Sequence, residues 1–108
     1  MNPTTKNLNE LFDRIPRRHS ADNVKDIYSI ADEYEGLLLN IEAENTFYEK
    51  NIAEFFDQLE EVRGLIKKST DNKASKKSKD SFFDDASGAL KDSVQALLEF
   101  YDDGKRTV

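Results

Sequence analysis

Residues 24–66 read VKDIYSIADEYEGLLLNIEAENTFYEKNIAEFFDQLEEVRGLI, and this stretch decides the fold. Apolar side chains recur through it in alternating steps of three and four residues, which is the spacing of an α-helix and not of a β-strand. The series, which holds one polar residue, is Val24, Ile27, Ala31, Tyr34, Leu38, Ile41, Asn45, Tyr48, Ile52, Phe55, Leu59, Val62 and Ile66.

Further apolar residues widen this stripe on both sides. They are Tyr28, Ile30, Leu37, Phe56 and Leu65. The seam of a dimeric coiled coil is narrower, because each of its helices faces only one neighbour. A wide stripe therefore predicts helices that pack in the interior of a bundle.

Two interpretations of the stretch remain open at this point. In the first, one continuous helix covers 21–68 and leaves half of its length to be covered by a second copy. In the second, the helix breaks near 44–46, where Thr46 and Glu49 fit the two positions of a capping box. The polar Asn45 on the seam favours the break, whereas the absence of glycine, proline or a phase slip argues against it.

The remainder of the chain adds two helices and a polar segment. Apolar residues at helical spacing indicate a short helix that Pro16 ends, and a second apolar series precedes the Asp102-Asp103-Gly104 terminus. We predict a single all-α domain with a short helix 4–15, three long helices in an up-down bundle at 21–43, 46–68 and 81–102, and a lysine-rich mobile loop at 69–79. The alternative is the long helix 21–68 packed in a dimeric coiled-coil bundle.

Composition and charge narrow the function. The 108 residues are 37% hydrophobic and 35% charged, with a net charge of −6 and no cysteine. An acidic chain is repelled by nucleic acid and by anionic membrane surfaces, so we expect neither as a direct partner. The chain has no apolar run near the roughly 20 residues that span a bilayer, and no signal-peptide core at its start. We expect a cytoplasmic protein, with leaderless secretion left open.

No constellation of catalytic or metal-binding residues stands out. His19 is the single histidine and lies in a polar connector beside Arg17 and Arg18, where nothing in the sequence would orient it. The same arginines precede Ser20 in a pattern that basophilic kinases accept, but Ser20 is also the expected N-cap of the next helix. Without Glu-x-x-His motifs, glycine-rich phosphate loops or cysteines, we expect no enzyme, no cofactor and no metal.

A lysine-rich segment contrasts with the acidic remainder. Between Lys67 and Lys79 six lysines face one acid, so this segment carries +5 and the rest carries −11. It is either a solubilising linker or an electrostatic contact for an acidic partner or a nucleic-acid backbone. The candidate contact residues are Lys73, Lys76, Lys77 and Lys79. No aromatic or arginine is interleaved, so base-specific recognition is not expected.

The leading functional hypothesis is a non-enzymatic protein–protein interaction module. It would be an adaptor, a small inhibitor or an assembly subunit that acts through one face of the bundle. Candidate partner-binding residues are Leu39, Phe47 and Phe56, whose alternative interpretation is ordinary core. Two further hypotheses are a self-associating coiled-coil homodimer and an acidic nucleic-acid mimic. The mimic would present rows of carboxylates to a nucleic-acid-binding enzyme. The candidates are Asp32, Glu33, Glu35, Glu42, Glu60, Glu61, Asp84, Asp85, Asp102 and Asp103.

Overall fold

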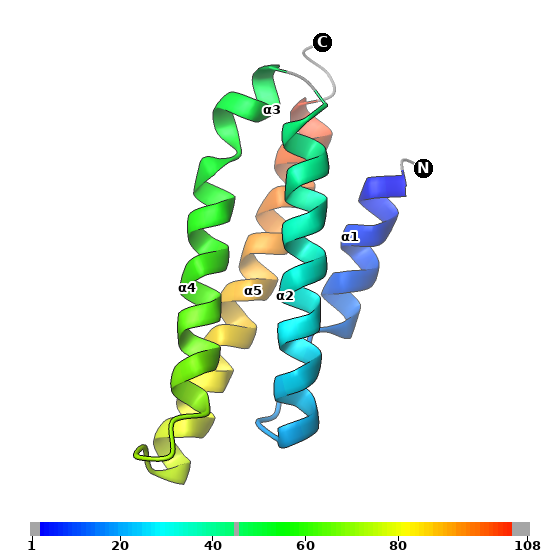
Figure 1. Ribbon diagram of the computed structural model, residues 1–108. Coiled ribbons are helices and arrows are strands. Elements are labelled where there is room, and N and C mark those ends of the chain that lie inside the picture. Colours follow the sequence, from blue (N-terminus) through cyan, green and yellow to red (C-terminus); the bar gives the residue numbers. More distant parts are fainter. Residues whose placement is uncertain (1–2, 45, 105–108) are drawn as a thin grey trace.

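The computed structural model describes residues 3–44 and 46–104, with side chains described as far as Tyr101. This part of the chain contains helices and no strand, so the all-α prediction is confirmed. The helices are α1 (Pro3–Arg14), α2 (Ala21–Glu42), α3 (Thr46–Asn51), α4 (Ala53–Ser69) and α5 (Lys76–Gly104) (Figure 1).

The long helices run up and down and form an elongated bundle of 49 × 24 × 17 Å. Figure 1 shows α2 and α4 side by side with α5 behind them, and α1 beside α2 at one edge. The most extensive helix contact is that between α4 and α5, and α1 packs against both α5 and α2. The predicted order, a short helix followed by three long helical segments, is therefore the observed one, with the second long segment divided into α3 and α4.

The predicted break in the long helix is present, and the interpretation of one continuous helix over 21–68 is wrong. Helix α2 ends at Glu42, and the Ala43 and Glu44 amides donate to the carbonyls of Leu39 and Ile41 at 3.2 and 3.0 Å. Ala43 keeps right-handed dihedral angles of −78° and −10°. Because Ala43, the residue that follows α2, keeps ordinary right-handed backbone geometry, that position requires no glycine. Asn45, the polar residue of the predicted seam, lies outside the described residues.

A second interruption follows at Ile52, which the sequence pattern does not reveal. Helix α3 ends at Asn51 and α4 begins at Ala53, while the Phe55 amide donates to the Ile52 carbonyl at 3.0 Å in a tight i→i+3 bond. The side chain of Ile52 is fully buried. The apolar phase therefore continues across the interruption, which explains why the seam shows no slip there.

The predicted seam forms the core. Its described members are buried except Val24, which is half-buried, and α5 lies against them with Phe83, Ala86, Leu90, Val94, Leu97 and Tyr101. Helix α1 adds Leu8 and Leu11. A seam that is buried within one chain no longer calls for a second copy to cover it.

The start of α5 corrects the predicted loop at 69–79. Ser69 belongs to α4, and α5 begins at Lys76, so the connection is limited to residues 70–75. Ser75 caps α5, because its Oγ accepts from the Ser78 amide at 3.1 Å and its carbonyl accepts from the Lys79 amide at 2.9 Å. Without apolar residues to mark a face, these first turns give no periodic signal in the sequence.

A buried polar contact joins three helices in the middle of the bundle. The Ser93 hydroxyl on α5 donates to Gln58 Oε1 on α4 at 2.6 Å, so the hydroxyl of Tyr34 on α2 donates to Ser93 Oγ at 2.8 Å. Burial raises the pKa of Tyr34 well above its ordinary value, which keeps the hydroxyl protonated as a donor.

Replacing Tyr34 with phenylalanine should lower the free energy of unfolding by about 1 kcal/mol, because the ring is kept and one buried hydrogen bond is lost. The matched control is Tyr28→Phe, whose ring lies partly exposed on the same helix. That change should shift stability by less than about 0.5 kcal/mol. Urea denaturation of both variants measures the difference, and equal effects would contradict the assignment.

Candidate interaction surfaces

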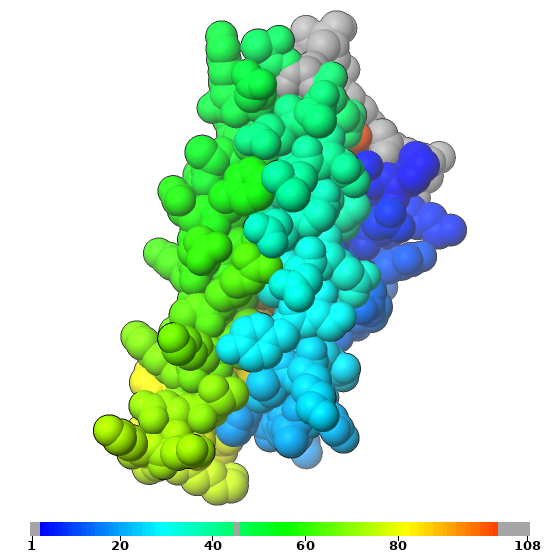
Figure 2. Space-filling view, in the orientation of Figure 1, coloured from blue at the N-terminus to red at the C-terminus, as the bar shows by residue number. Residues whose placement is uncertain are grey.

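One broad face of the molecule is formed by α2 and α4, which lie side by side across the view in Figure 2. Arg63 of α4 bridges the two helices, with Nη2 at 2.8 Å from Asp32 Oδ1 and at 3.1 Å from Glu35 Oε1. This pairing fixes which flank of each helix borders the other. We call the surface built on it, together with α3, the α2–α4 face.

Leu39 lies on the flank of α2 that borders α4. It is four residues from Glu35 and seven from Asp32, so helical spacing aligns the three side chains. Its side chain is 51% exposed, although leucines in the other helices of this chain are buried or half-buried. Phe56 lies two turns from Arg63 on the facing flank of α4 and is partly buried against the core.

Phe47 is exposed at the end of the bundle where α2 meets α3. It stacks on Phe100 with ring centres 5.7 Å apart and meets Tyr48 edge-on at 5.8 Å, yet it remains 38% exposed. Tyr48 donates to the Tyr101 carbonyl at 2.8 Å, which ties α3 to α5. The Tyr101 hydroxyl in turn donates to the Glu44 carboxylate at 2.7 Å. One side of the Phe47 ring is thus held in place while the other remains open.

These positions can be compared with the sequence-based candidates. Leu39 and Phe47 are the exposed members of the predicted trio, whereas Phe56 belongs to the margin of the core. Sequence analysis missed Tyr28, which it counted in the apolar stripe although its side chain is 36% exposed. Tyr28 lies four residues before Asp32, on the same flank as Leu39. The spacing of four and three residues from Tyr28 to Asp32 and Glu35 places Tyr28 on a charged helix face, and this spacing could have indicated that Tyr28 is exposed.

The surroundings of Leu39 and Phe47 are acidic. Residues 32–63 contain ten aspartates and glutamates against Lys50 and Arg63, for a local charge of −8. Some of these acids are paired within the chain, including the two that Arg63 contacts. The exposed apolar side chains are therefore set in a region of negative potential.

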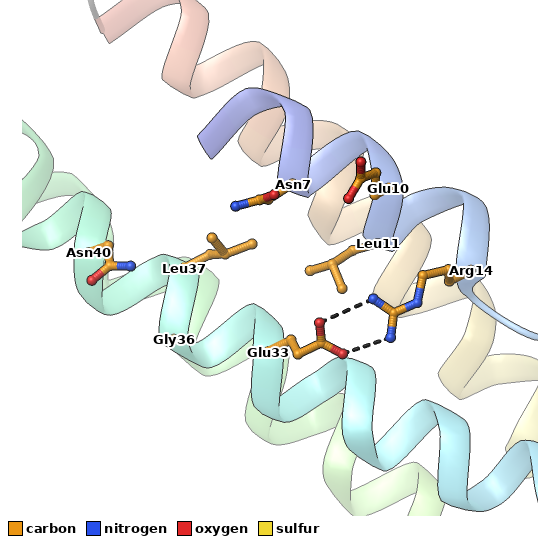
Figure 3. Close-up of a pocket in the computed structure, with 8 residues that line it drawn as sticks. All are labelled: Asn7, Glu10, Leu11, Arg14, Glu33, Gly36, Leu37 and Asn40. Carbon is orange, nitrogen blue, oxygen red and sulfur yellow. Dashed lines mark hydrogen bonds and ion pairs between the residues drawn. The ribbon is translucent and has the colours of Figure 1, made fainter. Parts of the chain in front are cut away.

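A cleft of about 330 Å³ separates α1 from α2 (Figure 3). Arg14 closes it with two hydrogen bonds to Glu33 at 3.1 and 2.7 Å, and the bond from Arg14 lowers the pKa of Glu33. Its other lining residues are Asn7, Glu10, Leu11, Gly36, Leu37 and Asn40. The described residues contain no cluster of three histidine, aspartate or glutamate side chains that could hold a metal ion. The polar groups of the cleft are thus the Arg14–Glu33 ion pair, the carboxylate of Glu10 and the amides of Asn7 and Asn40.

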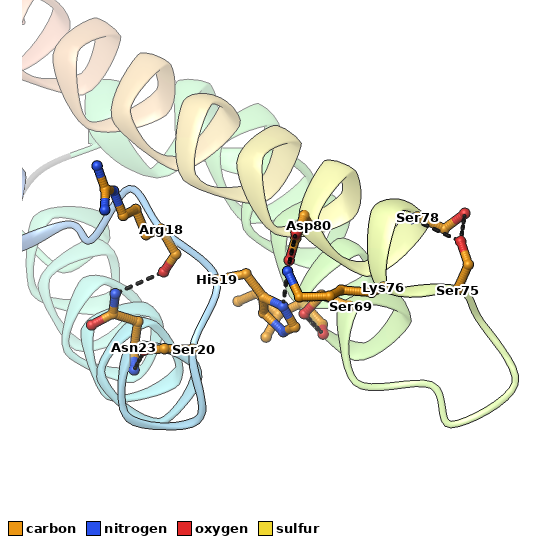
Figure 4. Close-up of polar contacts among 10 residues, drawn as sticks. Arg18, His19, Ser20, Asn23, Ser69, Ser75, Lys76, Ser78 and Asp80 are labelled. Carbon is orange, nitrogen blue, oxygen red and sulfur yellow. Dashed lines mark hydrogen bonds and ion pairs between the residues drawn. The ribbon is translucent and has the colours of Figure 1, made fainter.

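A second surface lies where the α1–α2 connector meets the start of α5 (Figure 4). His19 Nδ1 is 3.0 Å from Asp80 Oδ1, and its ring centre is 5.5 Å from that of Phe83. The expectation that nothing orients His19 is therefore wrong, because its partners are distant in sequence. Lys76 Nζ also contacts Asp80, at 3.3 Å. The hydrogen bond from His19, and then that from Lys76, lower the pKa of Asp80.

The predicted lysines fall at this same end of the bundle. Lys73 lies in the 70–75 connection, whereas Lys76, Lys77 and Lys79 belong to the first turns of α5. Arg17 and Arg18 join them, because an up-down bundle brings the α1–α2 connector to the end that carries the α4–α5 connection. Sequence reasoning separated the two groups, although the up-down topology it predicted already placed them together.

Among the acids proposed for nucleic-acid mimicry, the four that lie on α5 form two separate pairs. Asp84 and Asp85 are exposed near the start of α5, and Asp84 lines a hollow together with Arg17. Asp102 and Asp103 lie in the last turns of α5, and their side chains are outside the described part. The two pairs are about 27 Å apart along the helix at the usual rise per residue.

The Asp80 contact can be tested by carboxyl-carbon NMR titration. Asp80 should titrate below the ordinary aspartate pKa, and His19→Ala should raise its pKa more than Lys76→Ala does. Because the folded-state pKa is lowered, the stabilisation is present above the unfolded-state pKa and is lost as the pH falls through the folded-state value. A wild-type Asp80 with an ordinary pKa would refute the contact.

Comparison with known proteins gives no match, whether with protein-family models, with curated proteins or with solved structures. No helix in the described residues is both long and apolar enough to cross a membrane.

Proposed function

We propose that this chain is a non-enzymatic protein–protein interaction module that binds its partner through the α2–α4 face, around Leu39 and Phe47. The observation that carries the proposal is the 51% exposure of Leu39 in a chain whose other leucines are buried or half-buried. Contact between an exposed apolar side chain and water is unfavourable, and a partner that covers the side chain removes this contact and so gains binding free energy. Phe47 adds an aromatic ring close to the same end of α2, and aromatic residues are enriched at interfaces.

The charge around these residues indicates the chemistry of the partner. With −8 over residues 32–63, the face favours a protein that presents apolar side chains flanked by lysine or arginine. Such charges would speed the encounter and select against acidic competitors, while Leu39 and Phe47 supply the buried contact.

A second copy of this chain fits the face less well. Obligate homodimers bury more than about 2,000 Å² of largely apolar surface. The large apolar side chains that are exposed in the described structure are only Tyr28, Leu39 and Phe47. A smaller, more polar interface with a different protein suits this set, as in an adaptor, an inhibitor or an assembly subunit.

We expect the purified chain to sediment as a monomer of 12.4 kDa over a wide concentration range. The reason is that the apolar seam is already covered within one chain. Sedimentation equilibrium measures this directly, and a concentration-dependent dimer would favour self-association instead.

Replacing Leu39 with serine should weaken binding of the native partner about four- to tenfold. Leu39 is 51% exposed, so a partner can cover about half of its surface, which contributes about 0.8–1.5 kcal/mol, half the value for complete burial of a leucine. The matched control is Gln95→Ser, which introduces the same residue at an exposed position on α5. A partner isolated on the wild-type chain would be purified, and its dissociation constant measured by calorimetry with each variant.

Thermal unfolding of both variants would establish that neither change unfolds the bundle. Equal affinities for Leu39→Ser and Gln95→Ser would refute the proposed face. A partner that binds this face through an acidic segment would also contradict the charge argument, because the face itself is acidic.

A further inference from the structure

We propose that the end of the bundle opposite α3 is a separate binding site for an acidic peptide segment that carries an apolar side chain. We call this site the basic end, and it comprises residues 17–25 and 67–80. These residues contain nine lysines and arginines and three acids, so they carry +6 while the rest of the chain carries −12. The fold itself produces this separation, because it brings together two segments that are some fifty residues apart.

The first part of the site is a hollow of about 610 Å³ between the α1–α2 connector and α5. Arg17, Arg18, His19 and Lys76 line it, together with Asp80, Ser81 and Asp84. Asp80 is already paired with His19 and Lys76, so the two arginines outnumber the one remaining carboxylate, that of Asp84. Among the described residues neither Arg17 nor Arg18 pairs with a carboxylate, and both are exposed. Two guanidinium groups that lack an internal partner are suited to bind carboxylates, because each presents a planar fork of donors.

The second part is a neighbouring hollow of about 380 Å³, to which His19 also contributes. Ala21 and Val24 supply apolar wall, and Lys25 and Lys79 are among the lining residues. An apolar hollow lined by lysines matches an apolar side chain that has acids beside it in the same segment. The ordered His19 separates the two hollows, held by Asp80 and by the ring of Phe83.

A peptide fits these features better than a nucleic acid does. A polynucleotide longer than the basic end would extend along a body that carries −12, where its phosphates are repelled. Single-stranded nucleic acids are bound by stacking on open aromatic rings. At this end Phe83 is buried, and Phe82 is half-buried with Lys68 Nζ 5.7 Å from its ring centre.

The test uses the full-length chain and a short fluorescent peptide of glutamates with two central leucines. Fluorescence anisotropy should show saturable binding that weakens with salt. Arg17→Gln combined with Arg18→Gln should raise the dissociation constant about tenfold, as expected for loss of close charge pairs. The matched control is Lys6→Gln with Lys50→Gln, which removes the same charge from exposed positions away from the basic end and should change binding less than about twofold.

Two further arms test the apolar part of the site. A peptide with serines in place of the leucines should bind at least about tenfold more weakly, as expected for loss of leucine burial. Ala21→Glu should have a similar effect by placing a carboxylate in the apolar hollow. It should leave the protein folded, because an acid is favourable in the first turn of α2.

Three outcomes would overturn the proposal. They are no saturable peptide binding by the wild-type chain, equal affinity for the arginine variant and its lysine control, and tighter binding of a single-stranded oligonucleotide of equal charge. Since none of the residues substituted at the basic end is substituted in the Leu39 experiment, a failure here would leave that experiment unaffected, and the reverse also holds.

Discussion

Burial of one apolar seam along α2, α3 and α4, against α5 and α1, is the interaction on which the rest of the structure depends. A chain with only 37% hydrophobic residues has little apolar surface to spare, so nearly all of it must face the same interior. The turn after Glu42 makes this possible, because it folds the second half of the seam back onto the first. The outer faces of the helices can then carry charged residues, and these residues determine the surface that is available to other molecules.

The turn also determines where the charges go. Folding 21–69 into two antiparallel halves brings Asp32 and Glu35 of α2 beside Arg63 of α4, which pairs with both. It also returns the chain to the end where Arg17 and Arg18 lie, so that the lysines before and after residues 70–75 join them. A modest net charge of −6 thus conceals a large internal separation of charge.

Much of this fold could be predicted from the sequence, because burial of apolar side chains drives folding and these side chains recur at helical spacing. The seam positions and the short first helix follow from spacing. The break near 44–46 was also predicted, although α3 begins at Thr46, the residue that the capping pattern placed just before the helix. The start of α5 could not be placed, because residues 76–79 contain no apolar side chain whose spacing would indicate a helix. The helix begins there because Ser75 caps it. The interruption at Ile52 could not be predicted either, because the side chain of Ile52 is buried at the position that the regular apolar spacing requires.

The residues of the candidate interaction surfaces could be predicted only in part from the sequence. Leu39 and Phe47 stand out in the sequence because they fall off the seam, whereas Tyr28 was assigned to the core although it faces outward. His19 illustrates a general limit, because its partner Asp80 is sixty-one residues away and no local pattern links them. Such contacts follow from topology, so they emerge only once the order of the helices is used to bring distant segments together.

The Tyr34–Ser93–Gln58 contact has a consequence for the alignment of the helices. Apolar ridges repeat every turn, so two helices that meet only through such ridges can slide by about 5.4 Å and find a similar fit. A slide of that length would pull the three polar groups apart. It would leave the buried hydroxyls of Tyr34 and Ser93 unmatched, at a cost of about 1–3 kcal/mol each, whereas Gln58 is only half-buried. The Ser93 hydroxyl therefore helps to select one alignment of the three helices among those that the apolar ridges allow.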